Sequence, residues 1–133
     1  MLGTVFRQCA RFLLTLAVIL SLVSQGTPAF ATSPVVAKIQ SEVNTLQDLV
    51  DNQEWVNVRS YIHGPMGMIR KELAGLARDA ASAQRPQVLQ ANRQVLNNLE
   101  KIDAAAEDFD AQRLRSAQNA LQESVSALIT LAG

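Results

Sequence analysis

The sequence predicts an all-α protein, an up-down-up-down four-helix bundle whose second helix is long and kinked near Gly64 and Pro65. Three observations lead to this fold class. Apolar residues recur at alternating spacings of three and four in four successive segments, which is the period of amphipathic helices. The connections between these segments are short, and short connections force neighbouring helices to run antiparallel. No segment shows the strict alternation of apolar and polar residues that is typical of a strand.

Residues 1–31 have the features of a secretory signal peptide. Two arginines precede an apolar run at residues 12–23, and Ala29-Phe30-Ala31 provides the small-x-small pattern of a cleavage site. The apolar run is short compared with the about 20 residues that a membrane-spanning helix needs. We therefore expect cleavage after Ala31 and an exported four-helix bundle domain over residues 32–133. An uncleaved N-terminal anchor is the alternative.

Composition excludes several classes of protein. The whole chain has 12 basic and 12 acidic residues, so its charge gives no indication of nucleic-acid binding. Its one cysteine, Cys9, lies before the apolar run of the leader, whereas a lipoprotein cysteine lies directly after such a run. We therefore predict no lipid anchor. The domain after the leader has no cysteine, which excludes a disulfide or a thiolate metal site within it.

The first two helices follow directly after the leader. The first begins at Ser33-Pro34, because serine can cap a helix and proline at the first helical position loses no needed N–H group. Asp51 and Glu54 then resemble a capping box that starts the second helix. The apolar stripe of the first helix contains Val36, Ile39, Val43, Leu46 and Val50. The stripe of the second contains Trp55, Val58, Ile62, Met66, Ile69, Leu73, Leu76 and Ala80.

The third helix begins at Pro86, and the fourth follows Asp108 and Asp110, whose carboxylates suit the positive end of a helix dipole. Asn92 is the polar member of the third stripe, and it either fixes the register of the helix or contacts water; we favour water. The third stripe contains Val88, Asn92, Val95, Leu99, Ile102, Ala106 and Phe109, and the fourth Leu114, Ala117, Leu121, Val125, Leu128 and Leu131. The predicted core residues are Trp55, Ile62, Ile69, Leu73, Leu76, Val95, Leu99, Ile102, Leu114, Leu121 and Leu128.

Pro65 interrupts the helical pattern of the second helix. Its ring removes one backbone hydrogen bond and disfavours α-geometry at the preceding residue, which costs about 3 kcal/mol in a helix interior. Gly64 relieves the steric part of this cost, so we predict a kink at these two residues. The second helix is expected to span about 32 residues, more than its neighbours. The third helix would then cover it only to about Ile62, and the Trp55 end would form an angled arm covered by the first helix alone.

The residues around this kink resemble a known family. The run Trp55-x-x-Val58-Arg59-Ser60-Tyr61-Ile62-His63-Gly64-Pro65-Met66-Gly67 contains the single Trp, Tyr and His of the chain. It is similar to the PsbQ family, the extrinsic luminal subunit of photosystem II, in its cyanobacterial form. The likeness extends over most of residues 34–131, including the Arg-rich helix that follows and the acidic turn at Asp108 to Asp110. Residues 62–67 are its specific part.

The resemblance implies a non-catalytic subunit in the thylakoid lumen, peripheral on the luminal side of the thylakoid membrane. It implies the core antenna protein PsbB and PsbO as partners. It also implies a role in stabilising the oxygen-evolving complex and in retaining its calcium and chloride. Many cyanobacterial members look like lipoproteins, and the position of Cys9 departs from that pattern.

Three basic residues of the second helix are candidates for partner binding. Arg59, His63 and Arg70 fall within about 40° of one another on a helical wheel, beside the apolar stripe. Such a basic strip suits docking onto an acidic protein surface. The alternative is a solvated flank whose aliphatic stems cover the edge of the core. Tyr61 points away from the strip and is a candidate rim contact, whereas Trp55 is expected to pack in the core rather than to contact a partner.

No residue pattern indicates catalysis, a cofactor or a metal site. The chain has one histidine and no H-x-x-x-H or E-x-x-H pair, so the ligands of a di-metal bundle are missing. We interpret Glu107, Asp108 and Asp110 as helix caps, because calcium sites need about six to eight oxygen ligands. The alternative function is a periplasmic or luminal bundle that binds a small apolar ligand or haem. Haem would require an inward His or Met, and His63 lies next to the kink.

Overall fold

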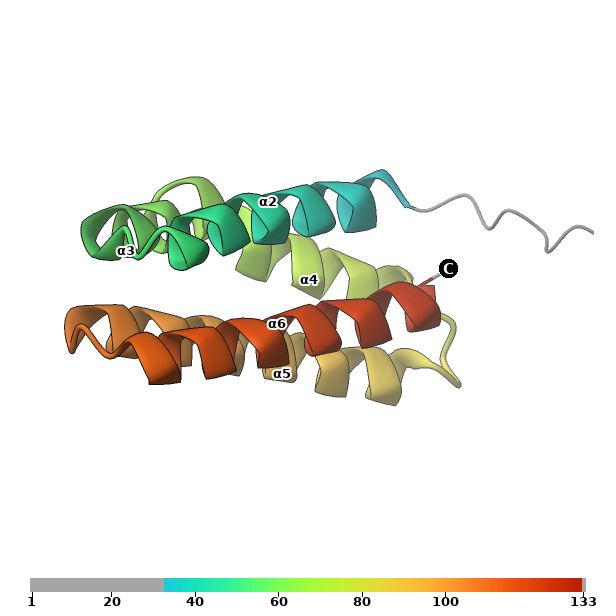
Figure 1. Cartoon of the computed structure of the whole chain (residues 1–133). Helices are drawn as coiled ribbons and strands as arrows, with labels where there is room; N and C mark the ends of the chain where they lie inside the picture. The colour runs from blue at the N-terminus through green and yellow to red at the C-terminus, as the bar shows by residue number, and fades with distance from the viewer. Residues whose placement is uncertain (1–32, 133) are drawn as a thin grey trace, which may run out of the picture. The chain divides into compact units, whose positions relative to one another are not determined.

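The structure is a computed structural model, and it describes residues 33–132. These residues form helices α2 (Pro34–Asp51), α3 (Trp55–His63), α4 (Ile69–Asp79), α5 (Arg85–Glu107) and α6 (Ala111–Ala132), and a short 3₁₀ helix, η1 (Pro65–Met68). Because α3, η1 and α4 follow one another as a single bent rod, the described residues contain four rods and no strand (Figure 1). The predicted leader and its cleavage site lie outside the described residues.

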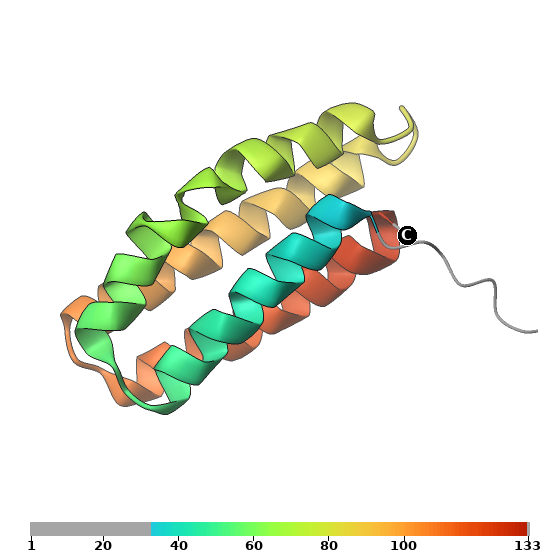
Figure 2. The same ribbon diagram turned by 90° about the horizontal axis from the view of Figure 1, so that it is seen from above.

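The four rods form an antiparallel bundle. Helix α5 packs against α6 on one side and against the bent rod on the other, and α2 packs against α6 and α3. Successive rods run in opposite directions, and α2 lies beside the bent rod (Figure 2). The predicted up-down-up-down four-helix bundle is therefore confirmed, together with the bend in its second helix. Within residues 33–132, no helix is long and apolar enough to cross a membrane.

The core lies along the line where the apolar stripes of the four rods meet. Of the eleven core positions inferred from periodicity, most are buried: Ile69, Leu73, Val95, Leu99, Ile102, Leu114, Leu121 and Leu128. Trp55, Ile62 and Leu76 are half-buried and pack against this cluster from its edge. Met66 of η1 is also buried, so the bend contributes to the core instead of lying outside it.

The second rod is shorter than expected, and this removes the uncovered arm. Helix α4 ends at Asp79 because Ala80 adopts an extended conformation (φ −65°, ψ 144°). The Arg85 guanidinium then donates hydrogen bonds to the carbonyl oxygens of Ala77, Arg78 and Ala80 at 3.1, 3.3 and 3.2 Å. The bent rod thus runs from residue 55 to 79, similar in length to α5. Helix α5 therefore covers α3 as well as α4, and the expectation that the first helix alone covers the Trp55 end is wrong.

Polar side chains inside the core were the second departure from the sequence pattern. Asn92 is buried, and its Nδ2 donates to the carbonyl oxygen of Leu73 at 2.6 Å. The interpretation of Asn92 as a water contact is therefore wrong, because the amide links α5 to α4. Asn98 donates to Ser124 Oγ at 2.7 Å, which links α5 to α6. Gln118 is fully buried in phase with the apolar stripe of α6, a position that its spacing would have revealed.

The turns α2–α3 and α5–α6 are two copies of one helix-ending motif. In each, the third residue after the helix donates to the helix's third-last carbonyl: Glu54 N to Leu49 O at 3.0 Å, and Asp110 N to Ala105 O at 2.9 Å. The residue before it has a positive φ, 53° at Gln53 and 54° at Phe109. This is the Schellman motif. It ends α5 at Glu107, so the expected place of Phe109 in the apolar stripe of that helix is wrong.

Candidate functional site

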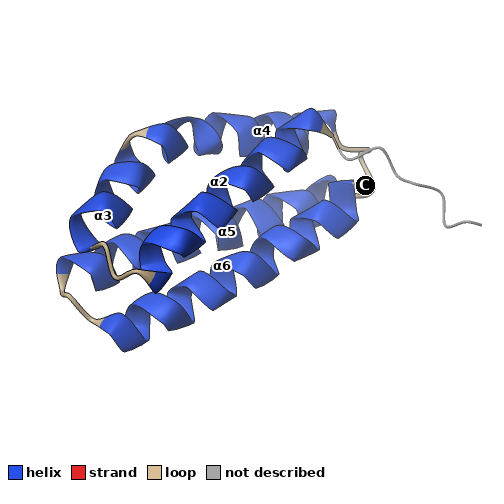
Figure 3. Cartoon of the chain, turned by 45° about the horizontal axis from the view of Figure 1, so that its top comes forward, coloured by secondary structure: helices blue, strands red, loops and turns tan. Residues whose placement is uncertain are grey.

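The candidate site is centred on the bend between α3 and α4 (Figure 3). Pro65 has no N–H group to continue the helix, and the backbone changes from α to 3₁₀ geometry there. Gly64 adopts φ −96° and ψ −95°, outside the helical region. A Cβ atom at Gly64 would lie 2.9 Å from the carbonyl oxygen of Ser60. Glycine at this position is therefore what allows the chain to bend so sharply.

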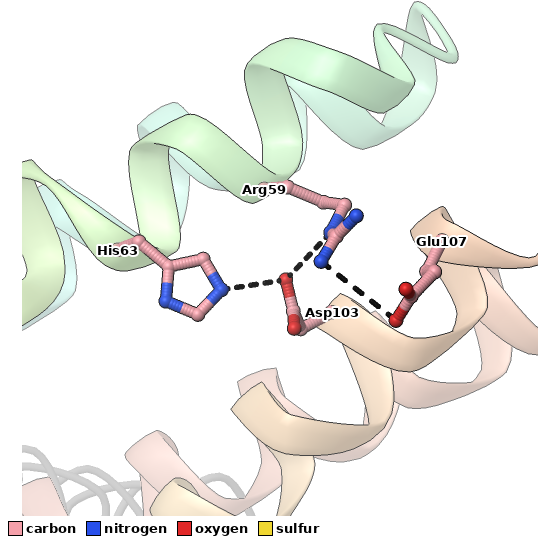
Figure 4. Close-up of polar contacts among 4 residues, drawn as sticks. All are labelled: Arg59, His63, Asp103 and Glu107. Atoms are coloured by element: carbon pink, nitrogen blue, oxygen red, sulfur yellow. Dashed lines mark hydrogen bonds and ion pairs between the residues drawn. The ribbon is translucent and has the colours of Figure 1, made fainter.

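The bend places the basic strip opposite a row of carboxylates on α5. Arg59 Nε donates to Asp103 Oδ1 at 3.2 Å, and His63 Nε2 lies 3.0 Å from the same oxygen (Figure 4). Arg59 Nη2 is also 3.7 Å from Glu107 Oε2. One turn past the bend, Arg70 Nη2 is 3.9 Å from Glu100 Oε1. The three acidic residues of α5 thus face the three residues of the basic strip, Arg59, His63 and Arg70.

These ion pairs determine which residues of the basic strip remain free to bind a partner. Arg59, predicted to contact a partner, is half-buried and bonded within the bundle. Arg70 keeps 71% of its side chain exposed, and its contact with Glu100 is long. Ion pairs between exposed groups contribute little, about 0.2–1 kcal/mol, so Arg70 is available to an external carboxylate. Tyr61 is half-buried and packs against the core, which leaves part of its ring at the surface.

A groove of about 280 Å³ lies beside the bend. The bent rod and α5 form it together, and its lining combines apolar side chains with His63, Arg70, Glu100 and Asp103. Gly67 contributes to its openness, because no atom lies within 4 Å of where a Cβ would be. The lining residues are Ile62, His63, Met66, Gly67, Ile69, Arg70, Leu96, Leu99, Glu100 and Asp103.

The sequence reasoning missed Glu100 and Asp103 of the carboxylate row on α5 and interpreted Glu107 only as a helix cap. Glu100, Asp103 and Glu107 recur at spacings of three and four, which is the signal of one helix face. The sequence alone does not say that this face of α5 meets the basic face of α3. Of the three acidic residues interpreted as helix caps, Asp110 caps α6, because its Oδ1 accepts from the Arg113 N–H at 2.9 Å. Asp108 instead pairs with the Arg113 side chain at 2.7 Å, and Glu107 pairs with Arg59.

The geometry gives no support to a metal or haem site at these positions. Across residues 33–132, His, Cys, Asp and Glu side chains form no group of three or more that could hold a metal ion. His63 lies at the bundle surface with 65% of its side chain exposed and next to Asp103. An axial haem ligand would have to point into the bundle instead.

A second polar cluster connects α2 with α4. Lys38 contacts the carboxylates of Glu42 and Glu72, and one oxygen of each carboxylate is buried without a hydrogen-bond partner. Burial raises the pKa of Glu42, and the neighbouring Glu72 carboxylate raises it further. The hydrogen bond to Glu72 raises the pKa of Lys38.

The raised pKa of Glu42 predicts a pH effect on stability. Because folding raises this pKa, the stabilising contribution is fully present below the glutamate's usual value of 4.5 and is lost as the pH rises through the folded value. Glu42→Gln should therefore raise the melting temperature at pH 7, by less than the about 4–8 °C that 1 kcal/mol produces in a domain of this size. Thermal denaturation at pH 7 and pH 4.5 tests this. A gain that grows on acidification would contradict the assignment.

Comparison with known proteins identifies the family. The family model of oxygen evolving enhancer protein 3, PsbQ, matches residues 20–131. CyanoQ from Synechocystis sp. is 33% identical over 76 residues, which cover 57% of this chain and 51% of the relative. The match therefore spans about half the length of this curated relative. The match to the family model includes the bend and all four rods, and the chain belongs to the PsbQ family.

Proposed function

We propose that the chain is a non-catalytic extrinsic subunit of photosystem II on the luminal side of the thylakoid membrane. Membership of the oxygen evolving enhancer family over residues 20–131 is the observation that carries this proposal. In this role the chain would be exported to the thylakoid lumen, where its leader would be cleaved after Ala31. Protein contacts would then hold the bundle at the membrane surface. PsbB and PsbO are the proposed partners.

The proposed mechanism is steric. A packed helical rod bound over the oxygen-evolving complex would slow the exchange of its calcium and chloride with the solvent. Such a subunit needs a stable core and a docking face, and it needs no reacting group. The buried stripe shared by four rods provides the first, and the face formed by the bend and α5 is the candidate for the second.

The candidate docking residues on this face are Arg59, Tyr61, His63 and Arg70, next to the bend at Gly64 and Pro65. The ion pairs with α5 leave this face close to neutral, so a partner is recognised here by shape and by the exposed ends of the side chains. Arg70 is the residue whose charge is best placed for an external carboxylate, because it is the most exposed of the three basic residues.

Affinity purification of the tagged full-length chain from thylakoid membranes tests the proposal. Recovery of photosystem II subunits, PsbB and PsbO among them, is the expected result. Recovery of no photosystem II subunit would count against it. An absorption spectrum of the chain purified by itself, free of photosystem II and its pigments, tests the second interpretation, a bundle for haem or a small apolar ligand. A Soret band would favour that interpretation, although the groove of about 280 Å³ is smaller than most drug-sized ligand sites, about 300–1,000 Å³.

Arg70→Glu is expected to weaken the association with photosystem II about two- to fivefold, because one exposed ion pair contributes about 0.2–1 kcal/mol. Lys71→Glu is the matched control, since it makes the same charge change at the neighbouring exposed position of α4. Binding of both variants to depleted membranes is measured at low and moderate salt. Equal binding by the two variants would show that Arg70 lies outside the contact. Arg59→Glu is unsuitable for this test, because it would also break two contacts inside the bundle.

A further inference from the structure

One end of the bundle carries two exposed apolar side chains together with the half-buried ring of Trp55. The turns α2–α3 and α5–α6 lie together at this end, as Figures 1 and 2 both show. The rings of Trp55 and Phe109 meet there edge to face, with centroids 5.7 Å apart. Phe109 nevertheless remains 66% exposed, and Val56, which follows Trp55, is 72% exposed. We call Trp55, Val56 and Phe109 the tip patch.

The backbone conformation of Phe109 is unusual for a residue with a large side chain. The position that it occupies in the Schellman motif has a φ of 54°, where glycine is the usual residue and a bulky side chain is strained. Glycine would end α5 with less strain and without exposing an aromatic ring. Within the fold, phenylalanine contacts Trp55 with one edge of its ring, and most of the side chain stays exposed. Aromatic residues are enriched at protein interfaces.

The surroundings of the tip patch are acidic. Five carboxylates belong to the two turns or the helix ends beside them: Asp51, Glu54, Glu107, Asp108 and Asp110. Arg59 pairs with Glu107, and Arg113 pairs with Asp108. No ion pair within residues 33–132 neutralises Asp51, Glu54 or Asp110, so the end keeps a negative charge. An apolar centre with a charged rim is the usual anatomy of a protein interface.

We infer that the tip patch docks a basic segment of a photosystem II protein, an apolar side chain of which packs on Phe109 while Lys or Arg side chains meet the surrounding carboxylates. This inference rests on the proposed function and adds a second contact to it. The acidic tip would bind a basic segment, whereas Arg70 would bind an acidic one. Substitutions that reverse charge can therefore distinguish the two contacts. The bent rod contributes to both contacts, with Trp55 and Val56 at its start and Arg70 just past its bend.

Phe109→Gly tests the patch in the full-length chain. It removes the ring and its contact with Trp55 but relieves the positive φ, and because these two effects oppose each other the melting temperature should change little. Association with photosystem II membranes should fall by about tenfold or more, as expected for an aromatic anchor of an interface. Gln53→Gly is the matched control, because it relieves the same backbone conformation in the sister turn without removing an aromatic ring. Equal binding by the two variants would overturn the inference.

Charge reversal tests the chemistry of the partner. Asp51→Lys and Asp79→Lys make the same change at the last residue of a helix, one at the tip and one at the end of α4. Lysine suits the C-terminal end of a helix dipole, so neither change should unfold the chain. Asp51→Lys should weaken binding and reduce its salt dependence, and Asp79→Lys should not. The reverse order, or no difference, would contradict a basic partner at the tip.

Photocrosslinking identifies what covers the patch. Phe109→p-benzoylphenylalanine in the full-length chain, illuminated with thylakoid membranes, should join position 109 to a Lys- or Arg-rich segment of a photosystem II protein. Crosslinks to a second copy of this chain, to lipid or to an acidic segment would overturn the inference.

Purification of the wild-type chain from thylakoid membranes distinguishes failure of the proposed function from failure of the tip inference. If it recovers no photosystem II, the proposed function fails. If it recovers photosystem II while Phe109→Gly binds like Gln53→Gly, the tip inference alone fails.

Discussion

Leu121→Ala is expected to lower the free energy of unfolding by about 2–5 kcal/mol, the largest effect of the substitutions considered for this bundle. Leu121 of α6 is fully buried in the core cluster. Truncation removes the transfer free energy of its methyl groups and leaves a cavity, because the helices on either side cannot close around the smaller side chain. A loss of this size is a large fraction of the stability of a small domain.

Urea unfolding followed by circular dichroism measures this loss. Leu89→Ala is the control, since Leu89 of α5 is 43% exposed and its truncation should cost much less. Equal losses for the two variants would show that α6 does not pack against the core as described. A change in the denaturant dependence of the free energy, rather than in the midpoint, would show that the folded or unfolded state itself has changed compactness.

Gly64→Ala is expected to destabilise the protein by about 1–3 kcal/mol, the usual range for a residue forced into a strained backbone conformation. The added Cβ would lie 2.9 Å from the carbonyl oxygen of Ser60, which is a backbone atom and cannot rotate away. The bend would have to open, and Met66 and Ile69 would shift because both are buried just past it. Opening the bend would also change the groove, so we expect weaker association with photosystem II in addition to lower stability.

Gly67→Ala is the matched control for this prediction. Gly67 lies three residues further along the same bend, and a Cβ there meets no atom within 4 Å. Replacing a glycine by alanine without strain usually stabilises a protein slightly, by about 0.4–1 kcal/mol, because the unfolded chain loses freedom. Thermal and urea unfolding of the two variants should therefore shift in opposite directions. Shifts of the same sign and size would mean that Gly64 is not under the steric constraint described.

The two substitutions also separate the bend from the rest of the docking face. Gly64→Ala alters the path of the backbone, whereas Arg70→Glu alters a surface charge and leaves the path unchanged. If photosystem II binding depends on the shape of the groove, Gly64→Ala should weaken it at every salt concentration. A defect confined to low salt would instead indicate a role of charge, because screening of exposed ion pairs increases with ionic strength.

Several features of the bundle follow from local sequence. The four apolar stripes and the kink at Gly64-Pro65 depend on residues a few positions apart, and local spacing fixes which side chains share a helix face. The end of α4 was misplaced by the same reasoning. Ala80 continues the apolar stripe, yet the helix ends at Asp79, where Ala80 turns extended and Arg85 donates hydrogen bonds to the last carbonyl oxygens. A side chain from the following segment decided that boundary.

The sequence by itself determined the helical class, the number of rods, the place of the bend and the likeness to the PsbQ family. The tertiary structure alone decided that Arg59 and His63 are paired with Asp103 and that Asn92 is bonded to the second rod. It also brought Trp55 and Phe109 together at an acidic end of the bundle. The physical reason is the range of the interactions. Periodicity records which residues share one helix face, but the rotation of each helix in the bundle decides which faces meet, and that rotation is set by the packing of all four rods.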